Sequence, residues 1–439
     1  MTRKLIELEP PVERALLVGA PRKGTPDATQ LEEHLDELAR LADTAGATVV
    51  GRAFQRVEAP TANLFLGQGK VEEVKGRAAD LGATLVLFDE GLSPVQGVNL
   101  EKALGMRVMD RAEVILDIFA TRARSAEAKM QVELAQLEYL LPRLTRMWTH
   151  LSRIRGGIGL RGPGETQLET DRRVIRRKIS VLRRRLEDVA LHRANVRQGR
   201  RDVPSAALVG YTNAGKSSLL RALSGEEVFV EDRLFATLDP LSREVDVGDH
   251  YRVRVTDTVG FIRKLPHHLV ASFRATLEEA SDADLLLHVI DAAHSDWEGQ
   301  AQVVEDVLAS LDAPARDGDE PGRKRLVHVF TKADLVADGA ALLESVRERY
   351  PHAVLASAGG RGPGVDDLRR VLRTSARALR PLASIRVPLA DGRLLASLHR
   401  EAEVLEQHQT DDVVEVRARV AASLLGRLRR DGVSVEIQP

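Results

Sequence analysis

Short apolar runs separated by amphipathic stretches characterise the first quarter of the chain. Alternation of buried strands with stretches of helical spacing, here near residues 28–45 and 70–81, predicts a parallel sheet covered by helices. We therefore expect a small N-terminal α/β domain over residues 1–110. Its candidate strands are rich in apolar residues and are Ala15–Val18, Thr48–Gly51 and Thr84–Phe88.

The apolar pattern then changes to a long helical spacing. Apolar residues recur alternately four and three positions apart from Met130 onwards, and a similar seam starts at Leu168. Such spacing is typical of two helices that pack along one seam. We expect an antiparallel helical hairpin over residues 111–200, with a kink where Pro142 interrupts the first helix. The join, roughly residues 152–167, is rich in glycine and arginine, so we expect a flexible basic tip.

Strand and helix patterns alternate again over residues 201–378 and predict a second α/β domain. Its candidate strands are Ala206–Val209, Arg252–Thr256, Leu285–Ile290, Leu326–Phe330 and Ala353–Ala356. The last segment, residues 379–439, shows the order β-α-β-β-α-β, which predicts a ferredoxin-like α+β domain. Its expected elements are Ile385–Leu389, Arg393–Glu401, Glu403–Gln407, Val413–Val420, Ala421–Arg430 and Val433–Ile437.

Composition narrows the protein class. A length of 439 residues with 43% hydrophobic residues fits several globular domains. The absence of cysteine excludes disulfides, thiolate metal sites and cysteine nucleophiles, and it fits a reducing compartment. The polar N-terminus is unlike a signal peptide, and no apolar run has the length of a membrane span. We therefore expect a cytoplasmic, monomeric protein without a membrane span.

A glycine-rich loop between a predicted strand and a predicted helix is the strongest chemical signal. Backbone N–H groups of such a loop wrap a phosphate, and the helix N-terminus adds partial positive charge. We expect Lys216 to reach the outer phosphates as a catalytic residue and Ser217 to bind Mg²⁺. The expected nucleotide-binding residues of this P-loop are Gly210, Tyr211, Thr212, Asn213, Ala214, Gly215, Lys216, Ser217 and Ser218.

Two further segments have the order and spacing of GTPase switches. Thr237 lies where a threonine would complete the Mg²⁺ shell, although a loop threonine alone is a weak signal. The next strand ends in an Asp-x-x-Gly sequence, in which Asp257 would bind Mg²⁺ through water and the Gly260 N–H would sense the γ-phosphate. We assign Thr237 and Gly260 to the catalytic step. The expected nucleotide contacts here are Asp257, Thr258, Val259 and Gly260.

Residues 331–334 resemble the Asn-Lys-x-Asp sequence that selects guanine. Asp334 would accept hydrogen bonds from the guanine N1–H and 2-amino groups, which adenine lacks. Lys332 belongs to the same motif, and Ser357 and Ala358 would complete the base pocket. Thr331 replaces the usual asparagine, and a hydroxyl can form only part of the hydrogen bonds of an amide. We therefore expect GTP and GDP to be the ligands, with modest affinity for the base.

Phe261 directly follows the Asp-x-x-Gly sequence. Many small GTPases place a glutamine there to orient the attacking water, and phenylalanine cannot do so. We therefore expect slow GTP hydrolysis that accelerates when a partner orders the switch loops.

Arginine is concentrated in the predicted hairpin, although the formal net charge of the chain is only −1. A charge run is usually a solvated helix face, but an unpaired basic run on a coiled coil would repel itself. Arginine pairs with phosphate bidentately and stacks on bases, so the pattern favours contact with RNA. The expected RNA contacts are Arg153, Arg155, Arg161, Arg172, Arg173, Arg176 and Arg177.

The segment 161–173, Arg-Gly-Pro-Gly-Glu-Thr-Gln-Leu-Glu-Thr-Asp-Arg-Arg, resembles the signature of the HflX family of ribosome-associated GTPases. Residues 257–266, Phe261 included, and 67–75 also resemble that family, and the resemblance covers nearly the whole chain. Thr331 is the main departure. The resemblance implies the large ribosomal subunit and its RNA as partners, with the hairpin tip near the peptidyl-transferase region. It also implies that some members split stalled ribosomes under stress.

Three alternatives remain compatible with the sequence. Some relatives bind ATP through the N-terminal domain, where Gly67-Gln-Gly-Lys70 is a candidate contact, although a two-glycine turn is usually only a turn. A signalling adaptor would use the hairpin to bind a protein helix and should expose an apolar stripe; salt dependence of binding separates it from an RNA binder. A general NTPase would follow if Thr331 relaxes base choice, which a comparison of GTP and ATP turnover tests.

Overall fold

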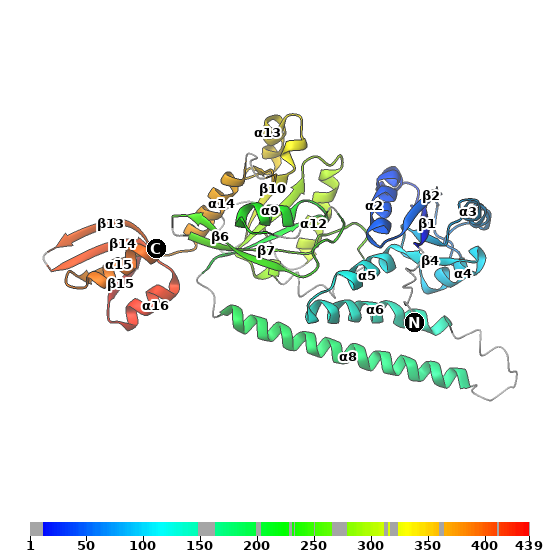
Figure 1. Ribbon diagram of the computed structural model, residues 1–439, viewed down its shortest axis with the longest axis horizontal. Coiled ribbons are helices and arrows are strands. Elements are labelled where there is room, and N and C mark those ends of the chain that lie inside the picture. Colours follow the sequence, from blue (N-terminus) through cyan, green and yellow to red (C-terminus); the bar gives the residue numbers. More distant parts are fainter. Residues whose placement is uncertain are drawn as a thin grey trace, which may run out of the picture. The chain divides into compact units, whose positions relative to one another are not determined.

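The structure is a computed structural model, and it forms two compact units (Figure 1). The first unit comprises Met1–Asp188, Arg233–Phe235 and Lys264–Phe273, and the second comprises Val189–Asp232, Ala236–Arg263 and Arg274–Pro439. The bounds of the four domains expected from the sequence stay a prediction. The structure describes residues 12–147, 163–198, 203–227, 231, 233–249, 251–265, 279–310, 315–316, 324–359, 364–410 and 412–438.

A parallel sheet of four strands, in the order β2-β1-β3-β4, forms the centre of the first unit. Residues 15–18 of β1 are fully buried because the strand is central, which explains their unbroken apolar run. The predicted N-terminal α/β fold is confirmed. The strands are β1 Arg14–Gly19, β2 Thr48–Phe54, β3 Leu85–Phe88 and β4 Arg107–Asp110. The helices are α1 Pro26–Thr29, α2 Leu31–Thr44, α3 Gln68–Asp80, α4 Pro94–Leu104 and α5 Arg111–Arg122.

Two long helices, α6 Ala126–Met147 and α8 Pro163–Gln198, form the predicted hairpin, and α8 returns alongside α6 (Figure 1). Leu134 of α6 packs with Ile179 and Leu182 of α8 in a buried cluster, as the apolar seams predicted. Pro142 lies inside α6. Residues 152–162 of the predicted tip, with Arg153, Arg155 and Arg161, lie outside the described residues, whereas residues 163–167 form the start of α8 and not a flexible tip. In the described part of the chain, no helix is long and apolar enough to cross a membrane.

A larger sheet in the second unit has the order β11-β10-β8-β5-β7-β6, and β9 pairs with β10. All its pairings are parallel except that of β6 with β7, so several carboxyl ends of strands meet at one edge, where ligands bind in such sheets. The strands are β5 Ser205–Gly210, β6 Leu241–Gly248, β7 Tyr251–Asp257, β8 Leu285–Asp291, β9 Ala315–Arg316, β10 Lys324–Thr331 and β11 Val354–Leu355. The helices are α9 Lys216–Ser224, α12 Trp297–Ser310, η1 Ala333–Leu335, α13 Gly339–Arg349 and α14 Val365–Ala378.

The C-terminal part of the second unit has the predicted β-α-β-β-α-β order. Its sheet is antiparallel, in the order β13-β14-β12-β15, and both helices contribute to one apolar core. The Tyr251 hydroxyl of β7 donates a hydrogen bond of 2.7 Å to Glu403 of β13 and joins this sheet to the larger one. The elements are β12 Leu382–Pro388, α15 Gly392–Glu401, β13 Glu403–Thr410, β14 Val413–Arg419, α16 Ala422–Arg430 and β15 Ser434–Gln438.

Candidate nucleotide-binding site

The glycine-rich loop lies between the end of β5 and the start of α9, as the sequence predicted. Gly215 has a φ of 94°, a left-handed conformation that glycine adopts without strain, and it caps the N-terminus of α9. At Gly210 a Cβ atom would collide with the carbonyl oxygen of Val289 in β8. Both glycines are therefore required by the backbone path. That path directs the first N–H groups of α9 to one place, where an anion is favoured.

Lys216 curves back over the loop that precedes it. Its ammonium group donates hydrogen bonds of 3.1 Å to the Gly210 carbonyl and 2.8 Å to the Tyr211 carbonyl. Burial lowers the pKa of Lys216 to about 8, against an opposing effect of Asp257. The side chain is thus held at the loop where the outer phosphates are expected, and most of it is charged at pH 7.

Three oxygen-bearing side chains expected to serve Mg²⁺ converge beside Lys216. The Ser217 hydroxyl lies 2.8 Å from that of Thr237 and 2.6 Å from an Asp257 carboxylate oxygen, and Thr237 lies 3.0 Å from the same oxygen. The other Asp257 oxygen is buried without a hydrogen-bond partner, and burial raises the pKa of this carboxyl. Magnesium prefers such hard oxygen ligands. The donor set fits this ion, which would neutralise the buried carboxylate.

The Asp-x-x-Gly segment lies directly on the phosphate loop. The Phe261 N–H donates to the Gly210 carbonyl over 3.0 Å, and the Thr212 N–H donates to the Phe261 carbonyl over 2.7 Å. A Cβ atom on Gly260 would lie 2.6 Å from the Thr212 Cα atom and 3.0 Å from the Lys216 ammonium. Only glycine permits this close approach of the segment to the loop. Thr258 anchors the segment through a 2.7 Å hydrogen bond to the Leu208 carbonyl.

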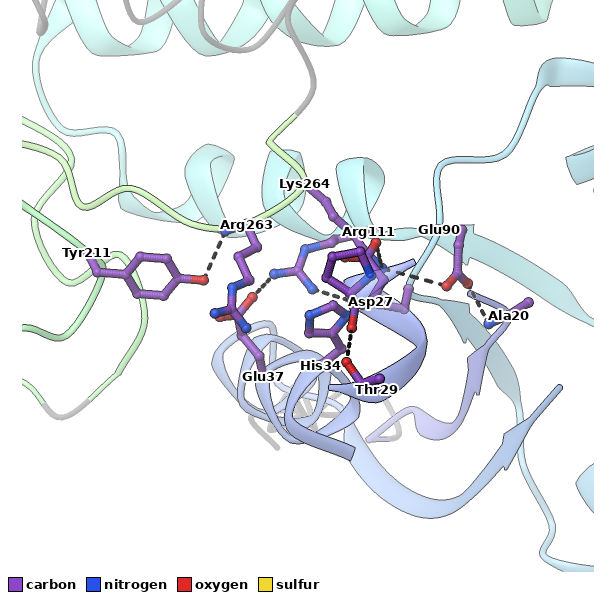
Figure 2. Close-up of polar contacts among 12 residues, drawn as sticks. Ala20, Asp27, Thr29, His34, Glu37, Glu90, Arg111, Tyr211, Arg263 and Lys264 are labelled. Carbon is purple, nitrogen blue, oxygen red and sulfur yellow. Dashed lines mark hydrogen bonds and ion pairs between the residues drawn. The ribbon is translucent and has the colours of Figure 1, made fainter. Parts of the chain in front are cut away.

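Sequence reasoning missed a polar connection at the far side of this loop. The Arg263 N–H donates to the Tyr211 hydroxyl over 2.9 Å (Figure 2), and the Arg263 guanidinium pairs with Asp296. Tyr211 itself is buried. In the sequence, this connection is signalled only by a tyrosine at the second position of the loop and, about fifty residues later, by the basic pair at 263–264.

The base-recognition segment follows the end of β10. The buried Thr331 hydroxyl lies 2.5 Å from the Ala214 carbonyl oxygen of the phosphate loop and 3.0 Å from that of Ile290. Asp334 lies in the short helix η1, where its carboxylate accepts a 2.7 Å hydrogen bond from the Ser357 hydroxyl. The structure therefore brings Thr331, Asp334 and Ser357 to the same edge of the sheet as the phosphate loop. Ala358, half-buried, follows Ser357 directly.

Lys332 has a partner that the sequence analysis did not identify. Its ammonium pairs with Asp291 over 2.6 Å, and its backbone has a φ of 57°. Asp291 ends β8, directly opposite Thr331 in the parallel register of β8 and β10. An aspartate that ends a buried apolar strand was the available signal. The pair orients Lys332 along the edge where the base would lie.

The four described arginines of the predicted RNA contact lie on α8. Arg173, Arg176 and Arg177 are exposed and Arg172 is half-buried. Within the described residues, no carboxylate forms an ion pair with these three exposed arginines, whereas nearby Lys178 pairs with Glu133 and Arg183 pairs with Glu138. The α8 surface also exposes Val174, Val181 and Leu191, but charged residues separate them. The helix therefore presents positive charge more than an apolar stripe.

A separate polar cluster is buried in the first unit (Figure 2). Arg111 pairs with Asp89 over 2.7 Å and also with Glu37. Lys264, which belongs to this unit, lies 2.5 Å from Asp89 and 3.6 Å from Glu90. Burial raises the pKa of Glu90 to about 7 against the attraction of Lys264. This cluster is not at the candidate ATP contact, where Lys70 pairs with Glu73 over 2.6 Å.

Three known protein families match consecutive parts of the chain. The family described as "GTP-binding GTPase N-terminal" matches residues 32–120, and "GTP-binding GTPase Middle Region" matches residues 122–200. The family described as "50S ribosome-binding GTPase" matches residues 205–319.

Named relatives match along nearly the whole chain. A GTPase HflX of Magnetococcus marinus is 42% identical over 443 residues, which cover 99% of this chain and all of the relative. GTPase HflX of Escherichia coli K12 is 43% identical and covers 88% of this chain and 90% of the relative. Among solved structures, a GTP-binding protein of Sulfolobus solfataricus in complex with GDP is 25% identical, covers 84% of this chain and has a TM-score of 0.43.

Proposed function

This chain belongs to the HflX family of GTPases, and we propose that it binds the large ribosomal subunit with GTP bound and leaves after hydrolysis. The observation that carries this switch is the contact between the two switch segments and the phosphate loop. Thr237 and Gly260 approach the same loop from different segments. A γ-phosphate bound at the loop would hold both switch segments in place, and its loss would release both segments.

Each residue of the site has a distinct part in this proposal. The α9 N-terminus and Lys216 hold the phosphates, and Ser217, Thr237 and Asp257 hold Mg²⁺. If bound there, Mg²⁺ would supply positive charge against the negative charge of the phosphates. The Gly260 N–H donates to the γ-phosphate, while Asp334 accepts hydrogen bonds from guanine. The hydrogen bond from Ser357 to Asp334 supports this role, because it orients the carboxylate and leaves lone pairs on its oxygens for the two guanine donors.

The position of Phe261 supports the expectation of slow hydrolysis without a partner. Its backbone pairs with the loop on both sides, and its side chain is only 4% exposed. A buried phenyl ring offers no hydrogen bond to an attacking water. We propose that the ribosome supplies or orders the group that positions this water, as partners do for other GTPases.

The exposed arginines of α8 support RNA as the surface recognised. Arg173, Arg176 and Arg177 are available for phosphate contacts, which release counterions and make binding depend steeply on salt. The match of residues 205–319 to a family described as 50S ribosome-binding supports the same partner. Splitting of stalled ribosomes under stress is the finer proposal, and it requires the hairpin to enter between or within the subunits.

GTP turnover with added ribosomal particles tests the proposal. We expect slow turnover alone, strong stimulation by 50S subunits and little stimulation by 30S subunits. Replacing Arg173, Arg176 and Arg177 by glutamine should weaken stimulation without changing turnover of the isolated protein. Rapid turnover without any particle, or equal stimulation by both subunits, would contradict the proposal. Light scattering of 70S ribosomes with the protein and GTP tests splitting separately.

A further inference from the structure

Two histidines lie side by side on the central strands of the larger sheet. His288 of β8 and His328 of β10 are direct partners in the parallel register, so both side chains project from the same face. Their ring centroids are 5.3 Å apart. Helix α12 contributes Glu305 to this place, where a carboxylate oxygen lies 3.9 Å from His328 Nε2. The three residues form a compact cluster in which two members are almost wholly buried.

His288 is the member that ordinary packing leaves unexplained. Its side chain is 0% exposed, and neither ring nitrogen has a hydrogen-bond partner in the structure. A buried polar group without a partner is costly and rare, and in native proteins it usually indicates a bound ion or water. Its neighbours along β8 are leucine and valine, so the strand offers no other polar atom to the ring.

We propose that His288, His328 and Glu305 bind one divalent transition-metal ion, with Zn²⁺ as the best match. Each residue offers one ligand atom, and these atoms all lie within 4.8 Å of one another. Neighbouring ligands of tetrahedral zinc are about 3.3 Å apart, given metal–ligand bonds of about 2.0–2.1 Å. Glu305, whose side chain is 26% exposed, can rotate to adjust its own distance to the two imidazoles.

The chemistry of the three residues favours this ion over Mg²⁺ or Ca²⁺. Two imidazoles with one carboxylate are a known zinc ligand set, and the hard cations prefer oxygen alone. Burial lowers the pKa of both imidazoles, to about 4 for His328, so both rings are neutral at pH 7 and each has a lone pair to give. The partial exposure of Glu305 leaves room for water as the fourth ligand.

Tyr350, which follows α13, contacts two of the three proposed ligands without being a ligand itself. Its ring stacks on His328 with centroids 3.9 Å apart, and its hydroxyl donates a 3.0 Å hydrogen bond to Glu305. Such outer contacts orient ligands in metal sites. Arg349 lies 3.5 Å from the other Glu305 oxygen and competes for it, but Arg349 is half exposed and can turn to solvent.

The proposed ion would clamp three elements close to the base-recognition segment. His288 lies three residues before Asp291, and His328 lies three residues before Thr331. A metal that fixes the spacing of β8, β10 and α12 would therefore stabilise the second unit. This role is structural and does not depend on ribosome binding.

Zinc titration of the tag-free full-length protein tests the inference. The protein is stripped with a chelator, returned to excess Mg²⁺ and GDP to occupy the nucleotide site, and titrated with Zn²⁺. We expect one retained Zn²⁺ per chain and a rise in melting temperature. Co²⁺ should give the visible absorption of a tetrahedral site. Glu305→Gln and His328→Leu should each weaken zinc affinity by at least tenfold, as lost ligands do.

His352→Leu is the matched control, because His352 is exposed and outside the cluster. It should bind Zn²⁺ as the wild type does. If His328→Leu fails to fold, Glu305→Gln still decides the matter, since Glu305 lies at the helix surface. Absence of stoichiometric zinc in the wild type would overturn the inference. So would equal zinc binding by the wild type and Glu305→Gln, and an ordered water would then be the partner of His288.

Discussion

The hydroxyl of Thr331 lies 2.5 Å from the carbonyl oxygen of Ala214 and thereby joins the base-recognition segment to the phosphate loop. The same hydroxyl lies 3.0 Å from the Ile290 carbonyl, but it carries one proton and can donate to only one of them at a time. This geometry is consistent with the expectation that the threonine hydroxyl forms only part of the hydrogen bonds that an asparagine amide would form. The main contribution of this hydroxyl in the structure is to hold the loop rather than to touch the base.

Replacing Thr331 by valine removes this connection while it keeps the shape of the side chain. We predict that Thr331→Val weakens GDP binding roughly three- to tenfold, the effect of one buried hydrogen bond. Thr331→Ser keeps the hydroxyl and should bind nearly as well as the wild type. Fluorescent-nucleotide titration measures both. Equal affinities of the valine and serine variants would show that the hydroxyl has no such role.

Gly260 is predicted to tolerate no side chain. A Cβ atom would lie 2.6 Å from the Thr212 backbone, which cannot move without displacing the phosphate loop. Gly260→Ala should lower affinity for a non-hydrolysable GTP analogue at least tenfold, with a smaller loss for GDP, because only the γ-phosphate needs this approach. The control is Gly426→Ala in α16, where a Cβ atom meets nothing within 4 Å. Unchanged analogue binding by Gly260→Ala would refute the prediction.

Asp334 is predicted to set the choice of base. An asparagine here would present an N–H donor to the N–H donors of guanine, and two donors cannot form a hydrogen bond. Asp334→Asn should therefore lower GTP affinity at least about a hundredfold. Xanthine has a carbonyl oxygen in place of the 2-amino group, so the variant should prefer xanthosine triphosphate. Competition between the two nucleotides measures the change. Retained GTP preference would place base selection elsewhere.

The local motifs of the site could be predicted because their chemistry depends on adjacent residues. The glycine-rich loop from Gly210 to Ser217 is one example, since glycine and lysine at fixed spacing define it. The pairing of Asp291 with Lys332 could not be found in this way, although an aspartate at the end of an apolar strand is visible in the sequence. Asp291 meets Lys332 only because β8 and β10 pair in one particular register, which no local pattern specifies.

The same distinction applies to the fold. Central strands such as β1 and β8 are buried on both faces, so their apolar runs identify them. The edge strand β6, with its half-exposed alternating pattern, and the short β4 were not identified. Strands β6 and β4 form because neighbouring elements pair with them and bury them, and not because their own residues strongly prefer a strand. The hairpin seam was predictable because a helix keeps one side chain in every turn on the same face.

Glu90 is predicted to make the first unit less stable as the pH rises. Its pKa of about 7 in the folded state exceeds the ordinary value of 4.5, so between pH 4.5 and pH 7 the folded state binds more protons than the unfolded state. Stability should therefore fall from about pH 4.5 to 7, and the ionised carboxylate should cost up to about 3 kcal/mol above pH 7. Glu90→Gln keeps an acceptor for the Ala20 N–H and should flatten this dependence.

Amide hydrogen exchange of β1 and β3, corrected for the intrinsic rate at each pH, measures the effect on local stability. Glu73→Gln is a control at a half-exposed carboxylate of the same unit. Greater protection of the Glu90→Gln variant than of the wild type at pH 8 is expected. Lower protection at pH 8 would mean that the carboxylate stabilises the buried cluster, contrary to the prediction.

Co-sedimentation with 50S subunits in two nucleotide states tests the central claim most directly. With a non-hydrolysable GTP analogue, the protein should pellet with the subunit, and binding should weaken steeply as salt increases. With GDP, most of the protein should remain in the supernatant, because the γ-phosphate that orders Thr237 and Gly260 is missing. Equal pelleting in both states, or none in either, would contradict a GTP-gated ribosome-binding switch.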